Sequence, residues 1–232
     1  MIVKRKSSLL VFLVFASFIF GCGKLPTEQS LIKKVNADDK SFKGSWVYKS
    51  QMPGQFTCSV GTRISIEVSG KKFHLIGDCP ADERRTEEWI HDGRVLWQLI
   101  PSQKQVDWLE MKGFGKGPFW KMPIRMKPFG PIQETGEEEI AGRICKLLKI
   151  KGRYEQGDVT LSYWVDREKN LLLKKEHLLE AGGGVLVNEV YECENIEFAP
   201  TFREGTFNSK IPSDWLKVKK RYLDCELLDT KF

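Results

Sequence analysis

A mainly β fold (α+β by class), built as an antiparallel meander, is what the sequence predicts. Segments such as Arg63–Val68 alternate polar and apolar residues, which is typical of a strand with one buried face. Turn residues separate these segments, as at Ser69-Gly70 and Asp92-Gly93. No strand–helix–strand rhythm is present, so a parallel α/β sheet is not expected.

The predicted strands are short apolar-alternating segments that end at turn residues. In chain order they are residues 45–48, 63–68, 72–76, 89–91, 95–100, 106–111, 144–150, 159–165, 171–179 and 185–198. Turns at residues 166–170 and 182–184 join the last of these strands as hairpins. For the C-terminal extension, residues 213–232, two interpretations stay open, a helix capped by Ser213 or an edge strand, because the periodicity does not decide.

Residues 112–136 interrupt this rhythm and are predicted to form a lid or loop. Nine of these residues are glycine or proline, too many for a paired strand or a helix. Aromatic and methionine side chains are interleaved with cations, and such side chains adapt well to an apolar ligand. The candidates for this cover are Phe119, Trp120, Met122 and Met126. The alternative is an ordinary long loop whose aromatic residues complete the core.

The N-terminus has the pattern of an export signal. Lys4-Arg5-Lys6 precedes an apolar run that begins at Leu9, and Gly21-Cys22 follows it. Ile19 to Cys22 resembles the bacterial lipobox, in which the cysteine becomes the lipidated first residue of the mature chain. We therefore expect a signal peptide at residues 1–21 and a lipidated tether at residues 22–41. The alternative is a signal anchor that is not cleaved.

Composition and charge exclude other classes. The chain is 41% hydrophobic and 29% charged, which is typical of a globular protein. The formal net charge is +6, and three of the positive charges belong to the signal segment. The positive charge that remains on the rest of the chain is too small to predict a nucleic-acid partner.

An exported protein can form disulfides. Beyond Cys22, the cysteines are Cys58, Cys79, Cys145, Cys193 and Cys225. We expect a bond between Cys58 and Cys79, which flank one predicted hairpin, and with less support one between Cys145 and Cys193. No CxxC pair is present, so neither a thioredoxin-like site nor a zinc ribbon is expected.

No catalytic or metal-binding constellation is visible, so neither an enzyme nor a cofactor is predicted. The three histidines, at positions 74, 91 and 177, are too far apart in sequence for an HExxH-type zinc site. Glu137-Glu138-Glu139 is more typical of a solvated carboxylate run than of a metal site. Asp166 is expected to stabilise a turn rather than to catalyse a reaction.

The order of several motifs resembles the LolA/LolB-like family of lipoprotein carriers and the wider superfamily that sorts outer-membrane lipoproteins. Asp92-Gly93-Arg94-Val95-Leu96-Trp97 with Pro101 resembles the DGxxLW…P hairpin of these carriers. The other segments that carry the resemblance are residues 136–145, 164–166 with 171–174, 191, 195–198 and 207–212. Together the motifs span residues 42–212.

This resemblance implies a strongly curved antiparallel sheet that forms an unclosed half-barrel, with a lid over its concave face and an apolar cavity for acyl chains. The domain would comprise residues 42–232. The arginine that latches the lid to the sheet in carriers has no counterpart that can be placed. We expect the cavity floor to be Trp97, Leu99 and Trp108, because inward positions on adjacent strands repeat every two residues. The alternative is that these side chains fill the core.

The predicted function is to bind acyl chains or lipidated proteins during lipoprotein or lipid trafficking. The protein would be lipid-anchored and extracytoplasmic in the bacterial cell envelope, on the periplasmic face of the outer membrane by preference. The alternative is a regulatory module, similar to the MucB/RseB proteins, that acts through a membrane protein partner. A purely structural envelope protein is also left open.

Overall fold

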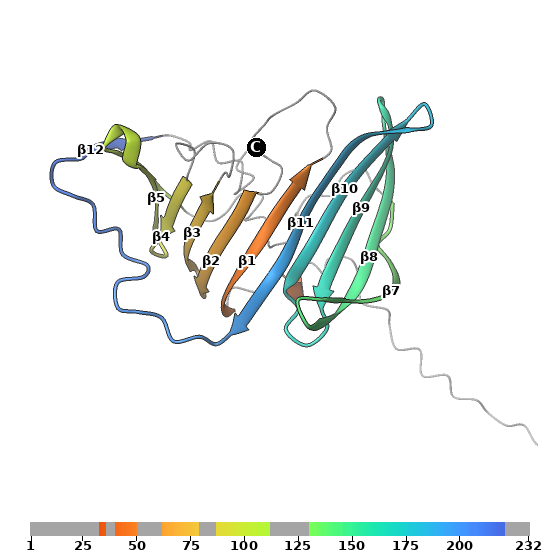
Figure 1. Cartoon of the computed structure of the whole chain (residues 1–232), viewed down its shortest axis with the longest axis horizontal. Helices are drawn as coiled ribbons and strands as arrows, with labels where there is room; N and C mark the ends of the chain where they lie inside the picture. Colours follow the sequence, from red (N-terminus) through yellow and green to blue (C-terminus); the bar gives the residue numbers. More distant parts are fainter. Residues whose placement is uncertain (1–32, 36–39, 51–61, 79–86, 112–129, 221–232) are drawn as a thin grey trace, which may run out of the picture.

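The computed structural model describes residues 33–35, 40–50, 62–78, 87–111 and 130–220. These residues form one twelve-stranded sheet in which β12 and β7 are the two edges, so the sheet is curved but not closed into a barrel (Figure 1). The expected mainly β, unclosed architecture is confirmed.

The strands in chain order are β1 (Ser41–Ser50), β2 (Thr62–Ser69), β3 (Lys72–Asp78), β4 (Glu87–His91), β5 (Val95–Ile100), β6 (Gln105–Glu110), β7 (Gln133–Ile140), β8 (Arg143–Tyr154), β9 (Gly157–Asp166), β10 (Leu172–Ala181), β11 (Gly184–Phe198) and β12 (Leu216–Lys219). Every predicted strand is present. Two further strands, β7 and β12, were not specified by the alternation.

The first strand lies in the middle of the sheet, between β2 and β11. From β1 the chain meanders outward to β6, and from the other edge β7 to β11 meander back to β1. These neighbours are antiparallel, as predicted. The segment after β11 then runs back along the sheet to β12, which pairs parallel with β6 (Figure 1). The C-terminal extension therefore begins as an edge strand rather than a helix.

Strand β7 includes the last four residues of the glycine- and proline-rich segment, 133–136. Seven of its eight residues are exposed, so it lacks the apolar alternation that marks the other strands. Its carboxylates pair with neighbouring strands and turns instead. Glu134 lies 3.0 Å from the Lys146 ammonium, and Glu138 accepts a hydrogen bond from the Trp164 indole at 2.6 Å. The acidic run is therefore part of a solvated edge strand.

One apolar cluster, the main core, contains residues from both halves of the sheet. Its fully buried members include Phe42, Trp46, Ile64, Phe73, Leu75, Trp89, Leu96, Cys145, Leu171 and Leu173. Trp46 also links two strands that are not neighbours, because its indole donates to the Leu173 carbonyl at 3.2 Å. The main core therefore joins β1 to β10 across β11.

A second core lies among β8, β9 and β10. It contains Leu148, Ile150, Tyr163, Val165 and Leu172, and Val35 of the short N-terminal helix packs against them. The Lys40 ammonium donates to the carbonyls of Val35 and Asn170. The start of the described chain is thereby held against this half of the sheet.

Curvature is strongest between β7 and β11. The Arg143 guanidinium of β8 lies 5.4 Å from the Phe198 ring of β11, although two strands separate β8 from β11. Register shifts occur in β1–β11, β10–β11, β9–β10 and β7–β8. Each extra residue bends and twists its strand, which explains why this half curls.

Helical structure is minor in the described chain. It consists of residues 33–35 and a 3₁₀ turn at Pro101–Gln103. None of the helices in these residues is long and apolar enough to cross a membrane.

Candidate functional site

Strands β4, β5 and β6 bring the predicted floor residues together on one face of the sheet. Trp97 of β5 pairs with Trp108 of β6, and Leu99 pairs with Val106. Partners in register on neighbouring strands share a face. The Trp97 and Trp108 ring centroids are 5.8 Å apart, and their planes are tilted by 30°. We call Trp97, Leu99 and Trp108 the aromatic platform.

Tight turns on both sides set this register. The Asp92 carboxylate accepts hydrogen bonds from the backbone N–H groups of Arg94 and Val95, each at 2.8 Å. Burial alone would raise the pKa of Asp92, but these backbone donors outweigh it and the pKa is lowered. At the other end, Lys104 adopts a left-handed conformation and donates to the Pro101 carbonyl. Both turns hold β5 so that Trp97 points to one side and Leu96 to the other.

The platform is partly exposed, and its surroundings are well packed. All three of its side chains have intermediate exposure, whereas Ile90 and Val106 on the same face are 4% and 0% exposed. The Lys219 ammonium of β12 lies 4.8 Å from the Trp108 ring centroid. The face therefore combines indole rings, aliphatic side chains and one cation.

This platform lies on the reverse of the main core. Leu96 and Phe73 belong to the main core, and alternation along β5 places Trp97 on the opposite face from Leu96. The predicted cover residues, Phe119, Trp120, Met122 and Met126, lie outside the described residues. A cavity closed between floor and cover stays a prediction.

A polar hollow of about 730 Å³ lies on the platform's side of β1, β2 and β3. Its lining residues are Lys43, Gly44, Ser45, Arg63, Ser65, Ile66, Glu67, His74, Ile76, Glu194 and Asn195. The charges here pair with one another or with neighbours. Arg63 lies 3.0 Å from Glu194, and His74 lies 2.9 Å from Glu88. This self-neutralised lining has no unpaired acid–base couple directed at a substrate.

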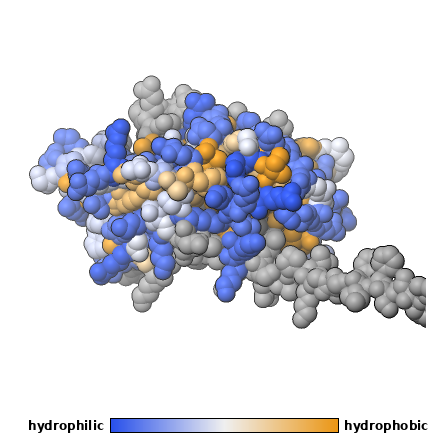
Figure 2. Space-filling view, turned by 90° about the horizontal axis from the view of Figure 1, so that it is seen from below, coloured by the Kyte–Doolittle hydropathy of each residue, from blue (hydrophilic) through white to orange (hydrophobic). Residues whose placement is uncertain are grey.

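Figure 2 shows the molecule from below, with apolar side chains forming a band within a largely hydrophilic surface. Among the described residues, no group of three or more His, Cys, Asp or Glu side chains could hold a metal ion.

The expected bond between Cys145 and Cys193 is wrong. Both are free thiols buried in the main core. Each thiol donates to a nearby backbone carbonyl, Cys145 to that of Arg143 and Cys193 to that of Asn195. Burial raises the pKa of each thiol to about 12. Cys22, Cys58, Cys79 and Cys225 lie outside the described residues.

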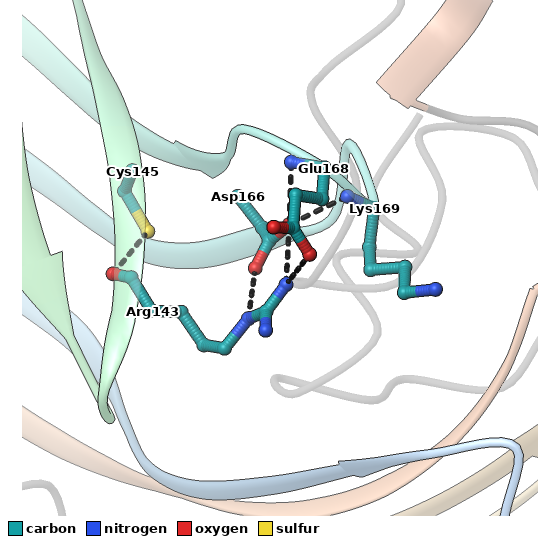
Figure 3. Close-up of polar contacts among 5 residues, drawn as sticks. All are labelled: Arg143, Cys145, Asp166, Glu168 and Lys169. Atoms are coloured by element: carbon teal, nitrogen blue, oxygen red, sulfur yellow. Dashed lines mark hydrogen bonds and ion pairs between the residues drawn. The ribbon is translucent and has the colours of Figure 1, made fainter.

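Asp166 stabilises a turn, as predicted. It is 1% exposed and accepts backbone hydrogen bonds from Glu168 at 2.9 Å and Lys169 at 2.5 Å (Figure 3). The Arg143 guanidinium lies 2.7 Å from its carboxylate and 2.7 Å from that of Glu168. Hydrogen bonds to Asp166 and Glu168 raise the Arg143 pKa further above its ordinary value. Arg143 thus ties β8 to the turn between β9 and β10.

A polar cluster on β1, β10 and β11 was not foreseen from the sequence. The Tyr48 hydroxyl donates to Glu189 at 3.0 Å, and His177 lies 3.4 Å from the same carboxylate. The hydrogen bond from His177, aided by Tyr48, lowers the pKa of Glu189. The contact between His177 and Glu189 could have been predicted from the pairing of β10 with β11, because the two residues are direct partners in register.

Three residues beside the aromatic platform were also missed. Ile90 and Val106 could have been found by pairing the predicted hairpins through Asp92-Gly93 and Pro101. Lys219 could not, because β12 pairs parallel with β6 after a connection of more than a hundred residues.

No family model matches the sequence, and no curated protein matches it. Solved structures do match. An uncharacterised conserved protein of Thermus thermophilus has a TM-score of 0.51 at 11% identity, over 83% of this chain and 98% of that one. MucB in the MucA/MucB complex of Pseudomonas aeruginosa has a TM-score of 0.47 at 19% identity, over 78% of this chain and 60% of that one.

A LolA-superfamily protein of Nitrosomonas europaea has a TM-score of 0.38 at 16% identity, over 78% of this chain and 97% of that one. The chain thus spans about three fifths of the MucB chain that it matches. At these identities the likenesses concern the fold alone.

Proposed function

We propose that this protein binds an acyl chain, free or attached to a lipoprotein, against the aromatic platform. The observation that supports this most directly is the register of β5 and β6, which places three large apolar side chains side by side and partly exposed. Large apolar side chains that stay partly exposed on one face commonly mark a binding surface.

The energetics fit a reversible binder. An acyl chain of about 16 carbons offers on the order of 10 kcal/mol at ~0.8 kcal/mol per buried CH₂, before the costs of ordering and association. A partly open platform would recover only part of this free energy, so the cargo could be released. Lys219, beside Trp108, would lie near an anionic head group or carboxylate.

We place the protein at the bacterial cell envelope, anchored through a lipid on Cys22 with residues 22–41 as the tether. Several acyl chains on one cysteine would make the anchoring effectively permanent. Replacing Cys22→Ser should yield a soluble protein or an unprocessed precursor. Unchanged membrane retention together with unchanged mass would refute the anchor.

The binding proposal is tested by purifying the full chain in mild detergent and identifying co-purified lipid by native mass spectrometry. Trp108→Asp places a charge against the acyl chain and should reduce bound lipid by at least about tenfold. Ile144→Asp is the matched control, because Ile144 is a large apolar side chain that is 49% exposed on β8, away from the platform.

Equal loss of lipid in both variants, or a wild-type protein that carries none, would contradict the proposal. A protein that carries no lipid but crosslinks to a membrane protein would instead support the regulatory alternative of the MucB/RseB type.

A further inference from the structure

Two neighbouring hairpin turns carry an unusual concentration of exposed apolar side chains. The exposed large hydrophobic residues of the described chain are Ile144, Tyr154, Val185, Leu186 and Leu216. Three of them lie on these turns, with Tyr154 at the β8–β9 turn and Val185 and Leu186 at the β10–β11 turn. We call these three residues the apolar tip.

The two turns are in direct contact. A Cβ placed on Gly157 would meet the Glu180 carbonyl at 2.1 Å and the Ala181 Cβ at 2.9 Å. Figure 1 shows both turns projecting together from the same end of the sheet. The apolar tip is therefore one surface built from two hairpins.

The β10–β11 hairpin projects past its other neighbour. Pairing of β11 with β1 ends at Glu189, opposite Ser50, so residues 184–188 pair with β10 alone in the described chain. Leu186 is the extra residue of a bulge, because Leu179 pairs with Val187 and Glu180 pairs with Val185. Gly182 and Gly183, at φ of 61° and 80°, make the tight turn that places Val185 and Leu186 near its end.

The chemistry of the turn fits the interface of a lipid bilayer. No charged residue occurs between Glu180 and Glu189. Tyrosine, with an apolar ring and a polar hydroxyl, is favoured at the boundary between head groups and acyl chains. In the β8–β9 turn, Glu155 directly follows Tyr154 and is exposed, and Arg153 lies 3.7 Å from Asp158, so these charges would lie among the head groups.

Size argues against a protein partner. A stable protein–protein interface buries about 800 Å² on each side and involves some 20–30 residues. Three side chains on two narrow turns provide far less, whereas a bilayer needs no complementary surface. We propose that the apolar tip inserts into the interfacial layer of a phospholipid membrane. This inference does not rest on acyl-chain binding at the aromatic platform.

The test uses the full chain reconstituted into phosphatidylcholine vesicles that contain a phosphatidylcholine with a diazirine in its acyl chain. After illumination, mass spectrometry maps the labelled peptides. We expect peptides with Tyr154 and with Val185-Leu186 to be labelled at least about fivefold more than those with Ile144 or Leu216, which are more exposed but lie elsewhere.

Leu186→Asp should lower labelling of both turns by about tenfold, because a charge at this depth opposes insertion of the whole tip. An unchanged thermal midpoint confirms that the exposed substitution leaves the fold intact. Labelling of the tip no stronger than at Ile144 and Leu216 would overturn the proposal. So would Tyr154 labelling that persists in the variant, since the two turns would then not enter the membrane together.

Discussion

The two halves of the sheet differ in how regularly their strands pair. From β1 to β6 and on to β12, no pair has a register shift, whereas four of the five pairs from β1–β11 through β7–β8 contain one. The regular half keeps an unbroken alternation between a core face and a reverse face, on which Ile90 and Val106 are buried as well. The bulged half curls and buries side chains on both faces, as in β9.

This difference indicates which residues contribute to stability and which contribute to binding. Regular alternation lets a strand bury Leu96 on one face and leave Trp97 partly exposed on the other. Bulges give up that division but bring distant strands together, as Arg143 and Phe198 show. We therefore expect substitutions in the main core and the bulged half to cost stability, and those on the platform to cost binding.

The largest effect is expected for Trp46→Ala, opposite the bulge at Glu194 of β11. Trp46 is 1% exposed and donates to Leu173 across β11, so its removal leaves a cavity and an unpaired carbonyl. The free energy of unfolding should fall by about 3–5 kcal/mol. Urea denaturation followed by circular dichroism measures it. Trp97→Ala is the comparison, and a loss as large as that of Trp46→Ala would show that the platform is core.

Next in size is Asp166→Ala, which removes the carboxylate that ties Arg143 to the β9–β10 turn. A buried pair that loses one partner costs about 3 kcal/mol, and two backbone donors also lose their acceptor. Arg153→Ala is the matched control, since its pair with Asp158 is exposed and worth about 0.5 kcal/mol or less. Similar losses of unfolding free energy in both variants would mean that the β9–β10 turn stabilises the bulged half no more than an exposed ion pair does.

An effect confined to alkaline pH is expected from the buried thiols. Because burial raises their pKa from 9.0 to about 12, their contribution is complete below pH 9 and is lost as the pH rises toward 12. Each thiol should add a slope of up to about 1.4 kcal/mol per pH unit in that range. Cys145→Ala should reduce the slope in denaturation series above pH 9. An identical slope in the variant would argue that the thiol is accessible to water.

The smallest effect is expected for Glu189→Gln, in the polar cluster near the centre of the sheet. The lowered pKa of Glu189 means that its contribution is present above pH 4.5 and is lost as the pH falls through its folded value. The variant should be less stable by about 0.5–1.5 kcal/mol at neutral pH, and the difference should shrink as the pH falls below 4.5. Glu180→Gln, on an exposed position of β10, should change little at either pH.

The local sequence was sufficient to predict a strand wherever one face of that strand is buried and the other is exposed to solvent. Residues 63–68 show this alternation, and Asp92-Gly93 between strands defines the hairpin that aligns Trp97. The two-residue period of a strand placed Trp97 and Leu99 on one face. It did not reveal β7, whose exposed residues have no apolar period, or the bulges, which depend on how neighbouring strands pair.

Which face of the regular half carries the main core was decided only in three dimensions. Alternation assigns Leu96 and Trp97 to opposite faces of β5 but does not say which face the bulged half of the sheet will cover. The bulges of β10 and β11 set the direction of curvature, and through it the strands that share a core. For the same reason, the sequence could list Cys145 and Cys193 but not the carbonyls to which their thiols donate, and could list Lys219 but not its place over Trp108. Strand periodicity is a property of a few adjacent residues, whereas curvature and edge pairing depend on contacts between residues far apart in the chain.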